Sequence, residues 1–274
     1  MTRSFKLTVA YDGTDYAGWQ VQPNQRTIQS ELQRAFKRVT QQDVQVVGSG
    51  RTDSGVHAIA QVASCQIESW NASATRLAAG LNTFLPESIV VTESIDAPDG
   101  FHAIRDSIGK RYRYQIQLGG LRNVFHHRYH WLYKHRVEIE SMIQAAKHFV
   151  GEKDFASFQA AGGERKSTVR TITHCELIED ESDYQNGFDQ SRLDLPGTGK
   201  RIAIEIEADG FLYNMVRNIV GTLVEVGRGK RSPDWITDVI EAKNRDVAGP
   251  TAPPQGLFLK RVDYNEFDLS GLAE

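Results

Sequence analysis

The residues best suited to chemistry lie in one short segment, Gly48 to Ala58, which reads GSGRTDSGVHA. Its single carboxylate, Asp53, follows Arg51 by two positions in a stretch that holds three glycines. A nearby cation favours the ionised form of an aspartate, and an ionised carboxylate can act as a nucleophile or a general base. Glycines let a backbone approach a ligand closely. The segment therefore predicts a reactive carboxylate in a glycine-rich loop.

Three other interpretations of this segment compete with catalysis. A dinucleotide-binding loop of the form GxGxxG would need glycine where Asp53 stands, so this interpretation is excluded. An aspartic protease needs two carboxylates that share a proton, and no second Asp-Ser/Thr-Gly occurs in the chain. A plain turn, in which Asp53 only bonds backbone N–H groups, stays open on the local residues alone.

The elements that must position this segment predict a mixed α and β chain. Hydrophobic periodicity predicts strands at 5–11, 44–47, 58–67 and 110–118, another ending before Asp209-Gly210, and helices at 27–39, 76–84, 139–150, 211–226 and 233–243. Thr27 can cap the first helix and Pro233 suits a first helical turn. A strand, Asp-Gly and a helix follow one another in both halves, which favours two related α+β halves at 1–105 and 106–274. The polar segment 181–200 is predicted to be a long exposed loop.

Composition narrows the class of protein. The 274 residues, of which 40% are hydrophobic and 24% charged, are typical of a globular protein near the upper size of a single core. The chain has neither an apolar run of membrane-spanning length nor an apolar N-terminal region, so we expect a cytoplasmic protein without a membrane contact. Cys65 and Cys175 lie in strand-like runs and are expected to be reduced core thiols. Metal-binding patterns such as CxxC are absent from the sequence.

The net charge is −3, which by itself argues weakly against nucleic acid as a partner. The basic residues, however, are grouped. The groups are Lys110, Arg111 and Arg113; His126, His127, Arg128, His130, Lys134, His135 and Arg136; Arg165, Lys166 and Arg170; and Arg228, Lys230 and Arg231. Such grouping allows one basic face for phosphates, while ordinary solvated surface charge is the alternative.

The run GRTDSGVHA resembles the signature of the tRNA pseudouridine synthase A (TruA) family, and other segments resemble the same family in the same order. They are LTVAYDGTDYAGWQVQPNQRTIQSEL, LNTFLP, FHA, KRYRY, DFASF, NMVRNIVG and the Gly-Leu pair at 256–257, which together extend from about residue 5 to residue 264. The resemblance implies the pseudouridine synthase fold, which is α+β with two similar halves, antiparallel-rich sheets and flanking helices around a central cleft.

The resemblance also implies an activity, the isomerisation of uridine to pseudouridine at positions 38, 39 and 40 in the anticodon arm of tRNA. The expected partners are tRNA and a second copy of the chain in a homodimer, and the reaction needs no cofactor and no metal. A non-catalytic tRNA-binding protein or tRNA chaperone that uses the same basic cleft is the alternative. A hydrolase built on Asp53 is a third hypothesis, for which the sequence offers no partner acid or metal-ligand set.

The family's catalytic aspartate corresponds to Asp53, and two companions from distant segments are implied. Tyr112 corresponds to an active-site tyrosine that would stack on an extruded base. Arg217 lies in the apolar run FLYNMVRNIVG and would pair with Asp53, because a buried arginine is costly unless it is paired. The alternatives are an ordinary strand aromatic for Tyr112 and a guanidinium that reaches water for Arg217.

Three further positions are implied to bind substrate. Arg51 would help open the duplex or take the place of the flipped base, Leu257 would pack against the target base, and His102 would lie near them. A plain core leucine and a structural histidine are the alternatives for the last two. The chain departs from the family where Ile104 follows Phe-His-Ala in place of a common arginine. If the strand register is kept there, Arg105 points to the opposite side.

Overall fold

The computed structural model describes residues 2–162, 167–179 and 195–266, and these fall into two compact units. Unit 1 contains the chain up to Lys110 together with the last strand from Phe258, and unit 2 runs from Arg111 to Leu257. The sequence-based division placed everything from residue 106 in the second half. The last strand instead joins unit 1, because Phe258 and Leu259 pair with residues of a unit 1 strand, His57 and Ala58.

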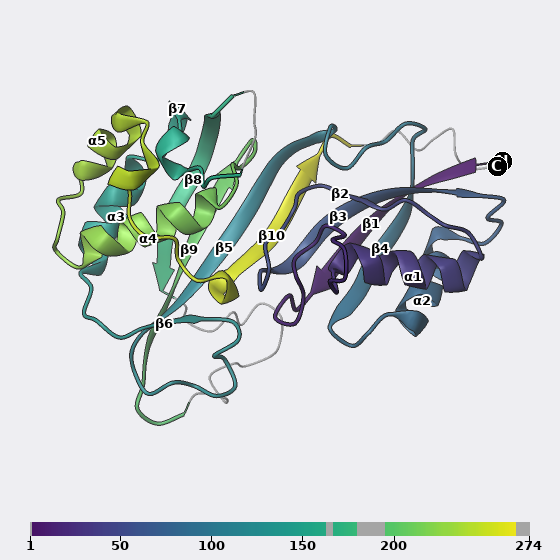
Figure 1. Ribbon diagram of the computed structural model, residues 1–274, viewed down its shortest axis with the longest axis horizontal. Coiled ribbons are helices and arrows are strands. Elements are labelled where there is room, and N and C mark those ends of the chain that lie inside the picture. Colours follow the sequence, from purple (N-terminus) through teal and green to yellow (C-terminus); the bar gives the residue numbers. More distant parts are fainter. Residues whose placement is uncertain (1, 163–166, 180–194, 267–274) are drawn as a thin grey trace. The chain divides into compact units, whose positions relative to one another are not determined.

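Unit 1 is built from mostly antiparallel strands and two helices (Figure 1). Its elements are β1 (Thr2–Tyr11), α1 (Ile28–Thr40), β2 (Val47–Gly48), β3 (His57–Glu68), α2 (Ala74–Phe84), β4 (Ile89–Ala97) and β10 (Leu257–Tyr264). The strand order is β4-β1-β3-β10, with β2 beside β3. β1 is antiparallel to both neighbours, whereas β10 is parallel to β3. The helices lie side by side, and α2 packs on β4.

Local chemistry explains where the helices of unit 1 begin and how they are held. The Thr27 hydroxyl accepts a hydrogen bond from the Ser30 backbone N–H, and the Ser30 hydroxyl accepts one from the Thr27 N–H, so α1 starts with a capping box. Asn82 of α2 bonds both the N–H and the C=O of Val91 in β4, at 2.8 and 2.9 Å. The LNTFLP segment therefore joins its helix to an edge strand.

Unit 2 combines antiparallel strands with three helices (Figure 1). β5 (Ser107–Gly120) enters from unit 1, and the other elements are β6 (Trp131–Tyr133), α3 (Ile139–Lys147), β7 (Gly151–Asp154), β8 (Val169–Glu179), β9 (Thr198–Ala208), α4 (Met215–Gly227) and α5 (Trp235–Ala242). The strand order is β5-β9-β8-β7, and β6 pairs with β5 in parallel. α4 is the most buried helix, and α3 packs against it. The predicted α+β class with antiparallel-rich sheets is confirmed in both units.

Most predicted elements are present, and the differences have local causes. The helix predicted from Phe211 begins only at Met215, because Asn214 has a left-handed backbone conformation with φ of 59°. The strand predicted at 44–47 is reduced to Val47–Gly48. β4, β6, β7 and β10 were not predicted. Of the loop predicted at 181–200, residues 181–194 lie outside the described residues, and β9 already begins at Thr198.

Both cysteines are buried free thiols, as predicted. Burial raises the pKa of Cys65 to about 12, and burial followed by the charge of Glu176 raises that of Cys175 to about 12. Both groups therefore stay protonated at neutral pH. Among the described helices, none is both long and apolar enough to cross a membrane.

Candidate active site

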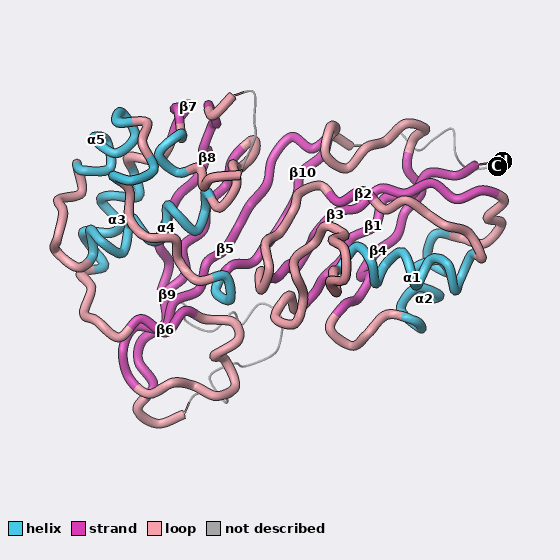
Figure 2. The backbone as a smooth tube through the Cα atoms, in the orientation of Figure 1, coloured by secondary structure: helices cyan, strands magenta, loops and turns pink. Residues whose placement is uncertain are grey.

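Asp53 is half-buried in the loop that connects β2 to β3 (Figure 2). The residues on either side of it are fixed by hydrogen bonds. The backbone C=O of Thr52 accepts a 3.0 Å bond from the Trp19 N–H, and the Ser54 hydroxyl donates a 3.1 Å bond to the C=O of Tyr16. The Val56 N–H donates to the C=O of Asp53 itself at 3.1 Å. The carboxylate therefore stands on a backbone with little freedom to move, as a reactive group requires.

A buried polar frame supports this loop from β1 and β3. The hydroxyls of Tyr11 and Thr52 share a 2.7 Å hydrogen bond. Gln61 accepts a 2.6 Å bond from the Ser49 hydroxyl and donates a 2.9 Å bond to the C=O of Gly50. Burial raises the pKa of Tyr11 far above its ordinary value, although hydrogen bonds with Thr52 and Gln61 oppose the shift, so the phenol stays neutral. Each of these buried polar groups is thus satisfied inside the protein.

Two glycines are needed where the Asp53 loop meets the loop between β1 and α1. A side-chain carbon on Gly48 would lie only 2.3 Å from the Trp19 indole ring. A side-chain carbon on Gly18 would lie 2.5 Å from the C=O of Thr52, and Gly18 also has a positive φ of 94°. The sequence suggested that the glycines of the loop serve a close approach to a ligand. Gly48 instead serves the packing of the loop against Trp19.

The strand that leaves the loop is anchored by His57. This side chain is fully buried, and its Nδ1 accepts a 3.1 Å hydrogen bond from the Gly13 N–H. Asp12 Oδ1 lies 3.1 Å from the same nitrogen. The His57 ring stacks on Phe258 of β10, with centroids 4.7 Å apart. The loop after β1, the start of β3 and the last strand of the chain are therefore held together behind Asp53.

Arg51 does not have the local role that its spacing suggested. Its side chain is exposed, and it forms no hydrogen bond or ion pair with any described residue. The expectation that Arg51 keeps Asp53 ionised from two positions away is not met in this structure. Exposure leaves its guanidinium available for a bound molecule.

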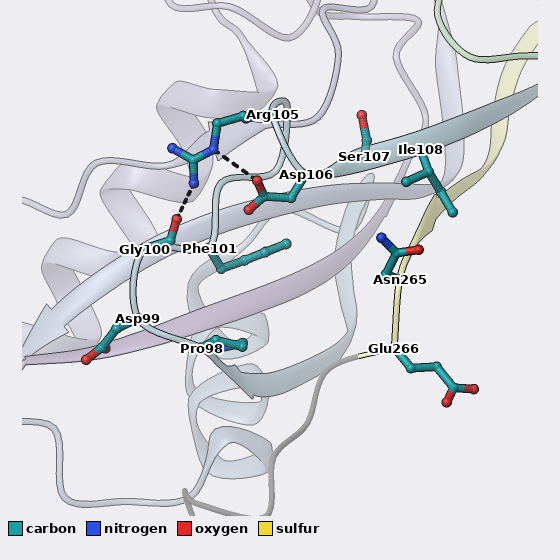
Figure 3. A pocket seen from close by; sticks show the side chains of 10 residues that line it. All are labelled: Pro98, Asp99, Gly100, Phe101, Arg105, Asp106, Ser107, Ile108, Asn265 and Glu266. Atoms are coloured by element: carbon teal, nitrogen blue, oxygen red, sulfur yellow. Dashed lines mark hydrogen bonds and ion pairs between the residues drawn. The ribbon is translucent and has the colours of Figure 1, made fainter.

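His102 and Arg105 belong to a turn, not to a strand. The Nδ1 of His102 accepts hydrogen bonds from the N–H groups of Ile104 and Arg105, at 3.2 and 3.3 Å. The Arg105 guanidinium is held between Asp106 Oδ1 and the C=O of Gly100 (Figure 3). The His102 N–H, and then Arg105, lower the pKa of Asp106. The strand-register argument for Arg105 therefore does not apply, because Arg105 lies in a turn. His102 helps to hold this turn, and its contact with substrate stays a prediction.

Figure 3 shows that this turn borders a pocket, which is edged by the carboxylates of Asp99, Asp106 and Glu266. Asp53 is not among the residues that line it. Because the only cation in its lining, Arg105, is already bonded to Asp106, the pocket is electrostatically unfit for phosphate. It is therefore not the candidate site.

Tyr112 lies on β5 in unit 2, and the strand alternates around it. Its buried ring meets the edge of Phe211, with centroids 5.0 Å apart. The neighbours Arg111 and Arg113 bond Glu205 and Glu207 of β9. Tyr114 is fully buried, and its hydroxyl donates a 2.7 Å bond to the C=O of Pro253. Tyr114 is therefore a structural residue, whereas the ring of Tyr112 packs edge-on against Phe211.

Arg217 is half-buried near the start of α4, and its direction is set by two hydrogen bonds. Its Nε donates to the C=O of Ala252 at 2.7 Å, and its Nη1 donates to Asn214 Oδ1 at 2.9 Å. The positive charge of Arg217 also acts on the nearby Tyr114, where it opposes the burial that raises the pKa of the phenol. The alternative interpretation, a guanidinium that reaches into water, does not fit a side chain fixed by these two hydrogen bonds.

The segment that accepts the bond from Arg217 is itself fixed to α4. The Oδ1 of Asn218, a fully buried residue, accepts bonds from Thr251 at 2.7 Å and Arg245 at 3.0 Å. This segment leads through Pro253 to Leu257, which is buried at the start of β10. Within unit 2, Arg217 and Tyr114 thus both hold the segment before Leu257.

Sequence reasoning missed the residues of the buried frame, Tyr11, Thr52, Gln61 and His57. Gln61 gave a usable signal, since a glutamine interrupts an otherwise apolar strand and buried polar groups need partners. Among the described residues, no three His, Cys, Asp or Glu side chains are placed to hold a metal ion.

Comparison with known proteins adds an independent finding. The chain matches the profile of a family described as tRNA pseudouridine synthase over residues 7–104 and 145–265. It is 44% identical over 262 residues to "tRNA pseudouridine synthase A 2" of Clostridium perfringens, covering 96% of this chain and 100% of the relative. It is 42% identical over 264 residues to "tRNA pseudouridine synthase A" of Acetivibrio thermocellus, again covering 96% and 100%.

Proposed function

From the premise that the chain belongs to the tRNA pseudouridine synthase family, we propose that it isomerises uridine to pseudouridine in tRNA, with Asp53 as the catalytic carboxylate. The observation that carries the proposal is the frame around Asp53. Hydrogen bonds to Tyr16 and Trp19 fix Ser54 and Thr52, the residues on either side of Asp53. The buried hydroxyl of Tyr11 also bonds the hydroxyl of Thr52. A turn whose aspartate only satisfied its own backbone would need none of this.

The reaction is an isomerisation, so substrate and product contain the same atoms. A ring nitrogen of the base leaves the sugar carbon, and a ring carbon of the same base takes its place. That carbon gives up its proton, and the freed ring nitrogen takes one up, so the protons balance. Asp53 supplies the carboxylate at the sugar, either by attacking the sugar carbon or by removing a sugar proton. The oxidation state of the nucleoside is unchanged, which is why the chemistry calls for no redox cofactor.

Arg217 and Tyr112 are the proposed companions of Asp53. A half-buried guanidinium held by Ala252 and Asn214 is suited to pair with a carboxylate, because less side-chain entropy is lost when the fork is already oriented. The aromatic ring of Tyr112 is suited to stack on a base flipped out of the RNA, a step that costs a few kcal/mol. Arg51, which is exposed, would contact RNA, and Leu257 would pack against the base.

The finer assignments are also part of the proposal. We infer that the target uridines are those at positions 38, 39 and 40 of the anticodon arm, that the enzyme acts as a homodimer, and that it works in the cytoplasm. They rest on the resemblance of the motifs around Asp53, Tyr112 and Arg217 to those of the family.

The test is to incubate an unmodified tRNA transcript with the wild type and with Asp53→Asn, and to map pseudouridine. We expect modification at 38 to 40 by the wild type and none by Asp53→Asn. Asp43→Asn is the matched control, since Asp43 is exposed and its ion pair among the described residues is with Lys37, and it should keep full activity. Full activity of Asp53→Asn would overturn the role of Asp53.

The same experiment addresses the non-catalytic alternative. A wild type that binds the transcript but forms no pseudouridine would favour a tRNA-binding protein or chaperone. Binding by Asp53→Asn that equals wild-type binding, together with lost modification, would instead separate chemistry from affinity and support the enzyme.

A further inference from the structure

Two basic groups that lie about ninety positions apart in the sequence are brought together in unit 2. One follows β6 and the other follows the C-terminal end of α4 (Figure 1). Their backbones are joined where the Glu138 N–H donates a 2.7 Å hydrogen bond to the C=O of Gly227. We call the basic side chains of these two segments the α4-end cluster. Its members are Lys134, Arg136, Arg228, Lys230 and Arg231.

The cluster is exposed and carries more positive than negative charge. The side chain of Arg136 is 90% exposed and that of Lys230 is 50% exposed. Glu225 bonds both Arg228 and Lys230, at 2.9 and 3.2 Å, and Glu138 lies 3.4 Å from Arg136. The next acid along the chain, Asp234, lies 3.4 Å from His148. The two segments thus carry five cations, of which three bond the carboxylates of Glu225 and Glu138.

Helix electrostatics do not account for the cluster. A cation at the C-terminal end of a helix is stabilised by the helix dipole, and this explains Arg228, which caps α4. Lys134 and Arg136 belong to another segment and gain little from that effect, which falls off beyond the last turn. The chain as a whole has a net charge of −3, so the cluster is opposite in sign to the protein that carries it.

We propose that the α4-end cluster binds the phosphate backbone of tRNA through side chains other than those of the Asp53 loop. The proposal rests on the proposed function, since it takes the tRNA substrate as the polyanion. Exposed lysines and arginines contact phosphates without reading bases, and each contact releases counterions from the RNA. The cluster thus contributes affinity and salt sensitivity, while the chemistry belongs to Asp53.

The test is a triple variant, Lys134→Gln, Arg136→Gln and Lys230→Gln, whose binding of an unmodified tRNA transcript is measured at several salt concentrations. Each lost phosphate contact reduces the slope of log affinity against log salt by about 0.7 to 0.9. We expect the slope to fall by about 2 and the affinity at low salt to fall by about tenfold or more. The rate of modification at saturating tRNA should stay at the wild-type value.

The matched control is Arg34→Gln, Lys37→Gln and Arg38→Gln on the exposed face of α1 in unit 1, which removes the same charge. Its slope should equal that of the wild type. Equal slopes in wild type and cluster variant would overturn the proposal, and so would equal losses in both variants, because these indicate only net charge. Failure of the proposed function appears separately, as absence of pseudouridine with the wild type.

Discussion

Two basic regions of unit 2 look alike in the sequence and differ in the structure. Arg111 and Arg113 face Glu205 and Glu207 of β9, and the side chains of Arg113 and Glu205 are only 9% and 6% exposed. The α4-end cluster is exposed and has an excess of cations. Because strand residues two apart share a face, the arginines at 111 and 113 match glutamates at 205 and 207. A basic run therefore suggests a phosphate surface only where no neighbouring strand supplies the matching acids.

The same contrast separates the two proposed functional regions. The Asp53 loop depends on buried polar partners such as Tyr11 and Thr52, which set its position. The α4-end cluster depends on charge, which acts over several ångströms and tolerates mobile side chains. Substitutions behind the loop should therefore lower stability and activity together, whereas substitutions in the cluster should lower affinity and leave stability almost unchanged.

The largest stability effect is expected from Glu205→Gln. The change removes the carboxylate that the buried guanidinium of Arg113 bonds, and breaking a buried ion pair from one side costs about 3 to 5 kcal/mol. Urea unfolding followed by circular dichroism measures this loss. Glu207→Gln is the matched control, because the side chains of Glu207 and of its partner Arg111 are partly exposed, at 22% and 25%. It should cost about 1 kcal/mol. Equal losses in the two variants would remove the distinction between the two basic regions.

A smaller loss is expected when either hydroxyl behind the Asp53 loop is removed. Tyr11→Phe or Thr52→Val leaves a buried hydroxyl with one partner fewer, which costs about 1 to 3 kcal/mol. The double variant should cost less than the sum of the two, because both groups of the bond are then gone. Modification at saturating tRNA should fall in each variant. A double variant whose loss equals the sum of the single losses would show that the two hydroxyls do not act as a pair.

The sequence predicted the parts of the fold that depend on neighbouring residues. The hydrophobic periodicity of α1 and its cap at Thr27 were visible in the sequence, because a helix and its cap depend on residues a few positions apart. The helix starts one residue after Thr27. β10 was not predicted, since its pairing with His57 and Ala58 joins residues about two hundred positions apart. The start of α4 was placed too early because periodicity does not reveal the left-handed Asn214.

The candidate site was predictable to a similar extent. Asp53 was found from residue type, spacing and resemblance. The bond between Tyr11 and Thr52 was not, because a hydroxyl in the sequence gives no indication of which distant hydroxyl it will meet. Arg217 was singled out by one charge in an apolar helix, yet its bond to Ala252 depends on how the segment after α5 folds back on α4.

The smallest stability effect is expected beside the α4-end cluster, from Glu225→Gln, because Glu225 bonds two of its members, Arg228 and Lys230. Partial burial alone would raise the pKa of Glu225, but hydrogen bonds from Arg228 and Lys230 and their charges bring it below its ordinary value of 4.5. A lowered folded-state pKa gives stability that is present above pH 4.5 and is lost as the pH falls through the folded value. For such a partly exposed pair the stability contribution is about 1 kcal/mol or less.

Wild type and Glu225→Gln should therefore differ slightly in unfolding free energy at pH 7 and converge in acid. In the same variant, tRNA binding should strengthen by about two- to threefold, as expected when roughly half a kcal/mol of competing ion pairing is removed. Measuring unfolding free energy and tRNA binding on this one variant tests whether the α4-end cluster differs from the buried region around Arg113. A variant with lower stability and weaker tRNA binding would mean that Glu225 positions the cluster, and the cluster would then resemble the buried region around Arg113 more than a free phosphate surface.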